Sequence, residues 1–186
     1  SMDGPVVHHT VADLFKSNAK VALTYHVMGT SFDLFNTAGA VLGGAAYLIP
    51  ALRRRVPSVW ASMGTVGFVM GTLGMVLGLA AKANIAAKGD NATPIPYNDE
   101  GIQQRVDGLS HNFKVLVLDL SVWSGIVVGA TTLIAAGGPA KLRLSTGILG
   151  VAQALSVGGA IGGIGAFICI YNNLPPKDDA DDNDDC

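Results

Sequence analysis

The stretch that decides the fold is residues 59–81, VWASMGTVGFVMGTLGMVLGLAA, which carries no charged side chain. About 20 apolar residues are enough for a helix to cross a bilayer, so these residues are predicted to form one span. Similar stretches at residues 32–52, 115–136 and 145–171 predict three more. Because the apolar runs are continuous and do not alternate with polar residues, helices are favoured over a β-barrel. We therefore expect an all-α integral membrane protein with four transmembrane helices.

The composition of the whole chain points to the same class of protein. Of its 186 residues, 49% are hydrophobic and only 14% are charged, and the mean hydropathy is +0.42. An ordinary soluble domain carries about 25% charged residues. The net charge of −2 supplies no surface that would neutralise nucleic-acid phosphates. These values exclude a conventional soluble enzyme, a disordered chain and a nucleic-acid-binding protein.

Short links pair the predicted spans into two hairpins. The links at residues 51–58 and 137–143 turn the chain back at once, so consecutive spans are expected to pack side by side. The expected organisation is a polar and amphipathic segment (1–31), a first transmembrane hairpin (32–81), a polar loop (82–114), a second transmembrane hairpin (115–171) and an acidic, disordered tail (172–186). In the polar loop, a helix that starts near Asn98 presents Ile102, Val106 and Leu109 on one face, which predicts a short amphipathic helix on the membrane surface.

The basic residues of the tight links indicate an orientation. Arg53, Arg54, Arg55, Lys141 and Arg143 lie in these links without any acidic residue. Short loops rich in Lys and Arg stay on the cytosolic or matrix side, so both termini are expected on the opposite side. The three consecutive arginines also predict contact with anionic lipid head groups, with cardiolipin as one candidate, a role that is compatible with a plain topology anchor.

The two hairpins share a sequence pattern that indicates duplication. A shift of 86 positions superimposes residues 33–48 on the start of the second hairpin. The aligned identities include Asp33 with Asp119, Gly39 with Gly125 and Gly43 with Gly129. Parallel repeats occur in transporters, and duplication is also a simple way to build a scaffold. The sequence leaves both interpretations open.

Glycine, at 24 residues, is about twice as frequent as usual, and its spacing places small residues along one stripe of each span. In lipid, helices associate through close backbone approach, which small residues permit. The predicted helix-packing positions are Gly39, Gly43, Gly64, Gly67, Gly71, Gly74, Gly78, Gly125, Gly129, Gly158 and Gly162. We expect more small-residue surface than four helices can bury among themselves, so that helices of another protein cover the rest. The alternative is packing within this chain alone.

Two aspartates, Asp33 and Asp119, are predicted near the starts of spans. An ionisable residue in a span is costly, so a paired site for protons or cations is one hypothesis. The other, which the position near each span start favours, is that each aspartate caps its helix at the membrane interface.

Other candidate chemistry is sparse. His26 and His111 precede the aspartates at similar distances, and a His–Asp pair is the minimum for acid–base catalysis. No nucleophile, metal-ligand set or phosphate-binding loop accompanies them, so interfacial histidines are favoured. Cys169 and Cys186 predict no disulfide framework. We therefore expect no catalytic residue, no cofactor and no metal.

Two segments and the size of the chain give a resemblance to a known family. The segments are the start at residues 6–15, VVHHTVADLF, and the block at residues 98–112, NDEGIQQRVDGLSHN. The chain resembles the fungal accessory membrane subunits, of the NUXM type, of mitochondrial NADH:ubiquinone oxidoreductase (complex I). The resemblance implies a subunit of the mitochondrial inner membrane, without catalytic residues of its own, that stabilises a respiratory-chain assembly and contacts phospholipid.

Three functions are therefore considered. The first is a non-catalytic accessory subunit of the complex I membrane arm, with other membrane subunits and phospholipids as partners. The second is a small proton- or ion-coupled transporter that uses Asp33 and Asp119. The third is a membrane enzyme for a lipidic substrate that uses His26 or His111.

Overall fold

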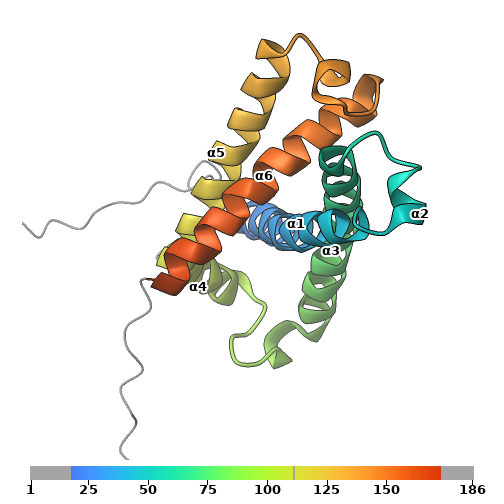
Figure 1. Cartoon of the computed structure of the whole chain (residues 1–186). Helices are drawn as coiled ribbons and strands as arrows, with labels where there is room; N and C mark the ends of the chain where they lie inside the picture. Colours follow the sequence, from blue (N-terminus) through green and yellow to red (C-terminus); the bar gives the residue numbers. More distant parts are fainter. Residues whose placement is uncertain (1–17, 111, 173–186) are drawn as a thin grey trace, which may run out of the picture.

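The computed structural model describes residues 18–110 and 112–172 of the chain (Figure 1). These residues form helices and contain no strand. Their elements are α1 (Ala19–Ala46), α2 (Pro50–Arg53), α3 (Val59–Lys88), the 3-10 turn η2 (Gly89–Asn91), α4 (Asp99–Ser110), α5 (Phe113–Ala135), the 3-10 turn η3 (Pro139–Leu142) and α6 (Gly147–Asn172). The prediction of an all-α protein is confirmed for this part of the chain.

Three of the helices are long and apolar enough to cross a membrane. The corresponding segments are Val59–Asn91, Val117–Ala135 and Gly147–Asn172, which match three of the four predicted spans. Helix α1 is as long as the others, but polar residues such as His26, Asp33 and Asn36 lower its hydropathy. A fourth span therefore stays a prediction.

Helix α1 also begins earlier and ends earlier than the span predicted at residues 32–52. The side chain of Asn18 caps its start by accepting a hydrogen bond from the backbone N–H of Val21, at 3.3 Å. The helix runs through the predicted boundary at residues 31 and 32 without a break. It ends at Ala46, and Pro50 begins the separate short helix α2, since proline fits the first turn of a helix but not its interior.

Helix α1 lies in the middle of the molecule, between α3 and the crossed pair of α5 and α6 (Figure 1). It packs most extensively against α3, and α5 packs against α6. The two pairs meet where α6 contacts both α3 and α1. The pairing agrees with the predicted hairpins, whereas their origin by duplication stays a prediction.

Glycines set the closest approaches between these helices. A Cβ atom added at Gly43 would lie 2.6 Å from the carbonyl oxygen of Ser62, and one added at Gly129 would lie 2.6 Å from that of Ala154. Both are well inside van der Waals contact, so only glycine allows the backbones to meet there. The two contacts are not in equivalent register, because the 86-position shift pairs Ser62 with Ile148.

The structure places all eleven predicted packing glycines against another helix of the same chain. In α3, for example, Gly64 meets Gln153 of α6 and Gly74 meets Phe35 of α1. The alternative expectation, packing within this chain, therefore holds at all eleven glycines, including the stripe of α3. The outward faces instead carry exposed aliphatic side chains such as Val69, Leu77 and Val127.

The helix predicted near Asn98 is confirmed as α4, and its expected position on the membrane surface stays a prediction. Ile102 and Val106, only 1% and 5% exposed, pack against Ala22 and Leu23 near the start of α1. The apolar face is therefore covered by protein. Of the polar and amphipathic segment expected at 1–31, residues 1–17 lie outside the described residues, as do His111 and the acidic tail after residue 172.

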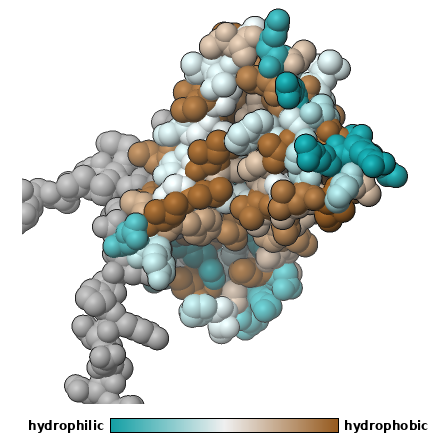
Figure 2. Space-filling model, in the orientation of Figure 1, coloured by the Kyte–Doolittle hydropathy of each residue, from teal (hydrophilic) through white to brown (hydrophobic). Residues whose placement is uncertain are grey.

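Polar groups gather at the two ends of the molecule. The hydroxyl of Ser58 donates to the carbonyl oxygen of Arg143 at 2.7 Å, which brings the two tight links together at one end. Lys20 pairs with Asp99 at 2.9 Å at the other end. Figure 2 shows hydrophilic side chains near α2 and around α4, with mostly hydrophobic side chains over α5 and α6 between them. This distribution suits a protein whose middle lies in lipid.

Candidate functional site

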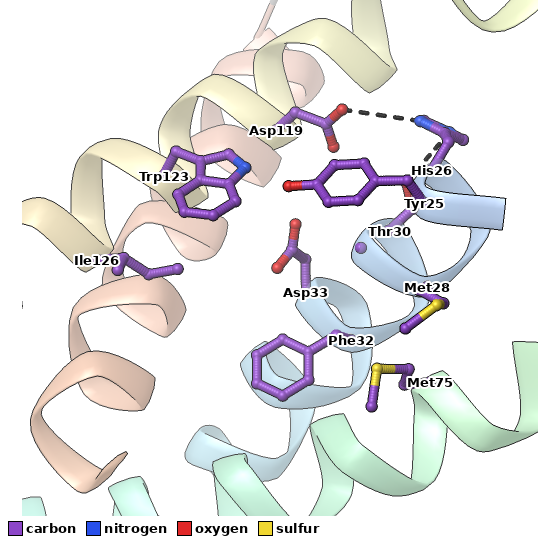
Figure 3. Close-up of a pocket in the computed structure, with 11 residues that line it drawn as sticks. Tyr25, His26, Met28, Thr30, Phe32, Asp33, Met75, Asp119, Trp123 and Ile126 are labelled. Atoms are coloured by element: carbon purple, nitrogen blue, oxygen red, sulfur yellow. Dashed lines mark hydrogen bonds and ion pairs between the residues drawn. The ribbon is translucent and has the colours of Figure 1, made fainter. Parts of the chain in front are cut away.

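The predicted aspartates lie at one pocket between α1 and α5, with a volume of about 270 Å³ (Figure 3). Its walls are mostly apolar or aromatic, and its polar side chains come from α1 and α5. The lining residues are Tyr25, His26, Met28, Gly29, Thr30, Phe32, Asp33, Met75, Asp119, Trp123 and Ile126. The pocket thus joins the two hairpins at equivalent positions of the proposed repeat.

Neither aspartate is a helix cap. Asp33 lies in the interior of α1 and is only 6% exposed, while the cap of that helix is Asn18. Asp119 lies in the second turn of α5, whose cap is Asn112, with its side chain accepting from the N–H of Lys114 at 3.0 Å. The capping interpretation is therefore wrong for both residues, because each helix begins upstream of the apolar run that the sequence shows.

His26 connects the pocket to Asp119. Its Nδ1 lies 3.8 Å from the carboxylate Oδ2 of Asp119, and its Nε2 lies 3.2 Å from the hydroxyl oxygen of Thr30. The first distance is longer than a hydrogen bond and suits an ion pair when the imidazole is protonated. With the proton on Nδ1, Nε2 accepts from the Thr30 hydroxyl, an assignment that follows from the partners. The sequence suggested that His26 pairs with Asp33 on its own helix, whereas the structure brings it close to Asp119 of the other hairpin.

Sequence reasoning did not identify Tyr25 or Trp123 as residues of this pocket. Figure 3 shows the Tyr25 ring between the two carboxylates and the Trp123 indole beside Asp33 and Asp119. A signal was available, since Trp123 follows Asp119 by four residues and so shares its helix face. Two carboxylates, an imidazole and a phenol at one pocket can hold a proton or a cation. In residues 18–110 and 112–172, no group of three or more His, Cys, Asp or Glu side chains is placed to hold a metal ion.

A second polar cluster lies deeper, between α1 and α6, and sequence reasoning missed it entirely. Asn36 and Ser156 are 1% and 3% exposed. The Asn36 amide Nδ2 donates to the Ser156 carbonyl oxygen at 3.0 Å, and the Ser156 hydroxyl donates to Asn36 Oδ1. These groups satisfy one another, which is the arrangement a structural tie in an apolar interior requires.

Gln153 forms a similar tie between α6 and α3. Its amide Nε2 donates to the hydroxyl oxygens of Thr65 at 2.8 Å and Ser145 at 3.0 Å, and its Oε1 accepts from the N–H of Ser145 at 2.8 Å. The side chain is only 1% exposed. The available signal in the sequence was a polar glutamine within a run of residues that carries no charge and is mostly apolar.

The arginines predicted to meet lipid lie on the surface at the end formed by the tight links. Arg53, Arg54 and Arg55 are all exposed, and the guanidinium of Arg53 stacks over the Tyr47 ring, 5.6 Å from its centroid. The basic residues of the second link, Lys141 and Arg143, are exposed at the same end. Five positive charges therefore share one end of the molecule.

The described residues form an all-helical protein with three helices that could cross a membrane, which is consistent with a multi-pass membrane protein. Comparison of the chain with protein-family models, with curated proteins and with solved structures found no match.

Proposed function

We propose that the protein is a non-catalytic accessory subunit of a respiratory complex of the mitochondrial inner membrane, complex I. In this proposal α1 is a fourth transmembrane helix, and the two helical pairs are duplicated hairpins. The protein stabilises the membrane arm by packing its helices against those of neighbouring subunits and by contacting phospholipid. The resemblance of residues 6–15 and 98–112 to accessory subunits of the NUXM type supports the choice of complex.

The observation that carries the proposal is a groove on the outer face of α5 and α6, with a volume of about 360 Å³. Small residues form much of it: Ser121, Ser124, Gly125, Gly158, Gly162 and Gly165. A Cβ atom added at Gly165 would have no neighbour within 4 Å, so this glycine is not needed for packing within the chain. A groove of this kind lets a helix of another subunit approach closely in lipid.

The buried polar groups support a structural role. The Asn36–Ser156 tie and the contacts of Gln153 use their hydrogen-bonding groups to hold α1, α3 and α6 together. These polar side chains are thereby engaged within the chain. The interior of the protein is built to hold the bundle in one arrangement, as a scaffold subunit requires.

Substitution in the groove tests the proposal. Gly165→Leu fills open space, so the chain should fold normally but lose most of its incorporation into the large complex. The matched control, Val69→Leu, changes an exposed side chain on α3 and should incorporate like the wild type. Incorporation is measured on native gels of mildly solubilised membranes. Normal incorporation of Gly165→Leu would remove the groove as the docking surface.

A second candidate function is proton- or cation-coupled transport through the Asp33–Asp119 pocket. The observation that favours it is the position of both carboxylates at one pocket, with Asp33 buried in the middle of a helix. Buried carboxylates of this kind often carry protons or cations in membrane proteins. A flux assay on the reconstituted chain separates this candidate from the subunit proposal.

A further inference from the structure

A third pocket, of about 420 Å³, lies at the end of the molecule formed by the tight links. It is bounded by α5 and α6, by the η3 link and by the first turn of α3. Its composition is divided: Lys141 and Arg143 are basic, whereas Val128, Val157 and Ile161 are aliphatic. A pocket with one charged side and one apolar side matches an amphiphile better than a polar solute.

The charge around this pocket has one sign. The chain has no Asp or Glu from residue 120 to residue 177 or from residue 34 to residue 89. Helices α5 and α6 and the first turn of α3 therefore present no acidic side chain to Lys141 and Arg143 except from the far end of α5. Lys141 and Arg143 are complementary to an anion. No carboxylate among the residues that line the pocket competes with that anion for them.

The link that carries the basic groups is held in a defined position. The Ser58 hydroxyl bonds the carbonyl oxygen of Arg143, and Leu144 is buried against Ala61 and Ala154. Arg143 itself has φ of 54°, in the left-handed region where glycine or asparagine is usual. Glycine or asparagine would adopt this backbone conformation with less strain, yet the chain has an arginine at this position.

The apolar side of the pocket faces outward. Val128 and Ile161 are 63% and 55% exposed, and both also line the groove farther along α5 and α6. Trp60, also at the pocket, is 49% exposed at the same end as the basic links. Tryptophan favours the level of the lipid head groups, so the position of Trp60 supports a pocket at the depth where a phosphate and the start of an acyl chain meet.

We propose that this pocket binds one anionic phospholipid. The phosphate pairs with Lys141 and Arg143, and the upper part of an acyl chain lies against Val128, Val157 and Ile161. This site is separate from Arg53–Arg55, which do not line the pocket. The inference rests on the membrane location in the proposed function and not on the presence of partner subunits, so it is tested on the isolated chain.

Tryptophan quenching provides the test, because the chain has only two tryptophans. The full chain carrying Trp123→Phe, which leaves Trp60 as the reporter, is reconstituted in phosphatidylcholine vesicles. Brominated phosphatidylglycerol or brominated phosphatidylcholine is then added as the probe. Trp60 should be quenched at a concentration of the anionic lipid on the order of tenfold lower than of the neutral lipid. Soluble glycerol phosphate should not compete, since it lacks the acyl chain.

Three variants complete the test. Lys141→Gln with Arg143→Asn removes both charges, and asparagine tolerates the left-handed backbone, so the preference for the anionic lipid should disappear. Arg53→Gln with Arg54→Gln removes equal charge at the same end and should keep the preference. The charge-conserving variant Lys141→Arg should also keep it, which covers the case of a misfolded double variant. Equal quenching by both lipids, or equal loss in the two double variants, would overturn the proposal.

Discussion

The side chain of Asn36 on α1 and the backbone and side chain of Ser156 on α6 form a reciprocal pair of hydrogen bonds that joins the two halves of the bundle. Both residues are almost completely buried, and a Cβ atom added at Gly67 of α3 would lie 2.7 Å from the Ser156 hydroxyl oxygen. Three helices therefore meet at this point. Asn36 lies one helical turn after Asp33, but neither Asn36 nor Ser156 lines the pocket, and their mutual hydrogen bonds hold the helices together.

Replacing Asn36 by leucine is expected to destabilise the fold by about 1–3 kcal/mol, because the buried Ser156 hydroxyl loses its acceptor. Unfolding by SDS in mixed micelles measures the loss. The single variant Ser156→Ala and the double variant complete a mutant cycle, which should show positive coupling between the two positions. Additive losses would contradict the tie.

Two glycines of the second hairpin, Gly129 and Gly165, allow a comparison between a packed position and an open one. Gly129→Ala places a Cβ atom 2.6 Å from the carbonyl oxygen of Ala154 and is expected to cost about 1–3 kcal/mol by forcing α5 and α6 apart. Gly165→Ala meets open space and should leave stability unchanged or slightly raised. The same SDS assay compares them. Equal effects at both positions would show that the close crossing does not stabilise the bundle.

The ion pair between Lys20 and Asp99 predicts a pH effect on α4. The hydrogen bond and charge of Lys20 lower the pKa of Asp99, so the pair stabilises the docked helix above the ordinary aspartate pKa. This contribution is lost as pH falls through the lowered pKa. Amide hydrogen exchange in α4 should therefore accelerate, relative to α6, below about pH 4. Asp99→Asn should remove this pH dependence; an unchanged profile in that variant would assign it to another group.

The second candidate function predicts the behaviour of the aspartates. If the pocket carries protons, the wild-type chain in liposomes conducts them, and Asp33→Asn with Asp119→Asn abolishes the flux while the fold is kept. If the protein is a scaffold, no flux occurs above that of empty liposomes. A pH-sensitive dye inside the liposomes measures the rate.

The sequence predicted the helical class and three membrane-crossing helices, because long uncharged runs such as residues 59–81 have few other stable arrangements in lipid. It predicted poorly where polar residues lie inside helices. The true start of α1 at Ala19 was hidden by Lys20, Thr24 and His26, which lowered its apparent hydropathy.

The candidate site was predicted only in part. Asp33 and Asp119 were identified, but their role as caps was wrong because the helix starts were misplaced. The pairing of His26 with Asp119 across two hairpins could not be derived, since it depends on how α1 and α5 pack. Asn36 shares this difficulty, because its importance comes from its burial, which tertiary contacts decide.

The proposed membership of complex I is tested most directly by the migration of the chain on a native gel after mild detergent extraction of mitochondria. A subunit of complex I should co-migrate, as a 19.1 kDa chain, with a far larger particle that stains for NADH dehydrogenase activity. Recovery of the chain only as a monomer or a small homo-oligomer, away from that activity, would contradict it.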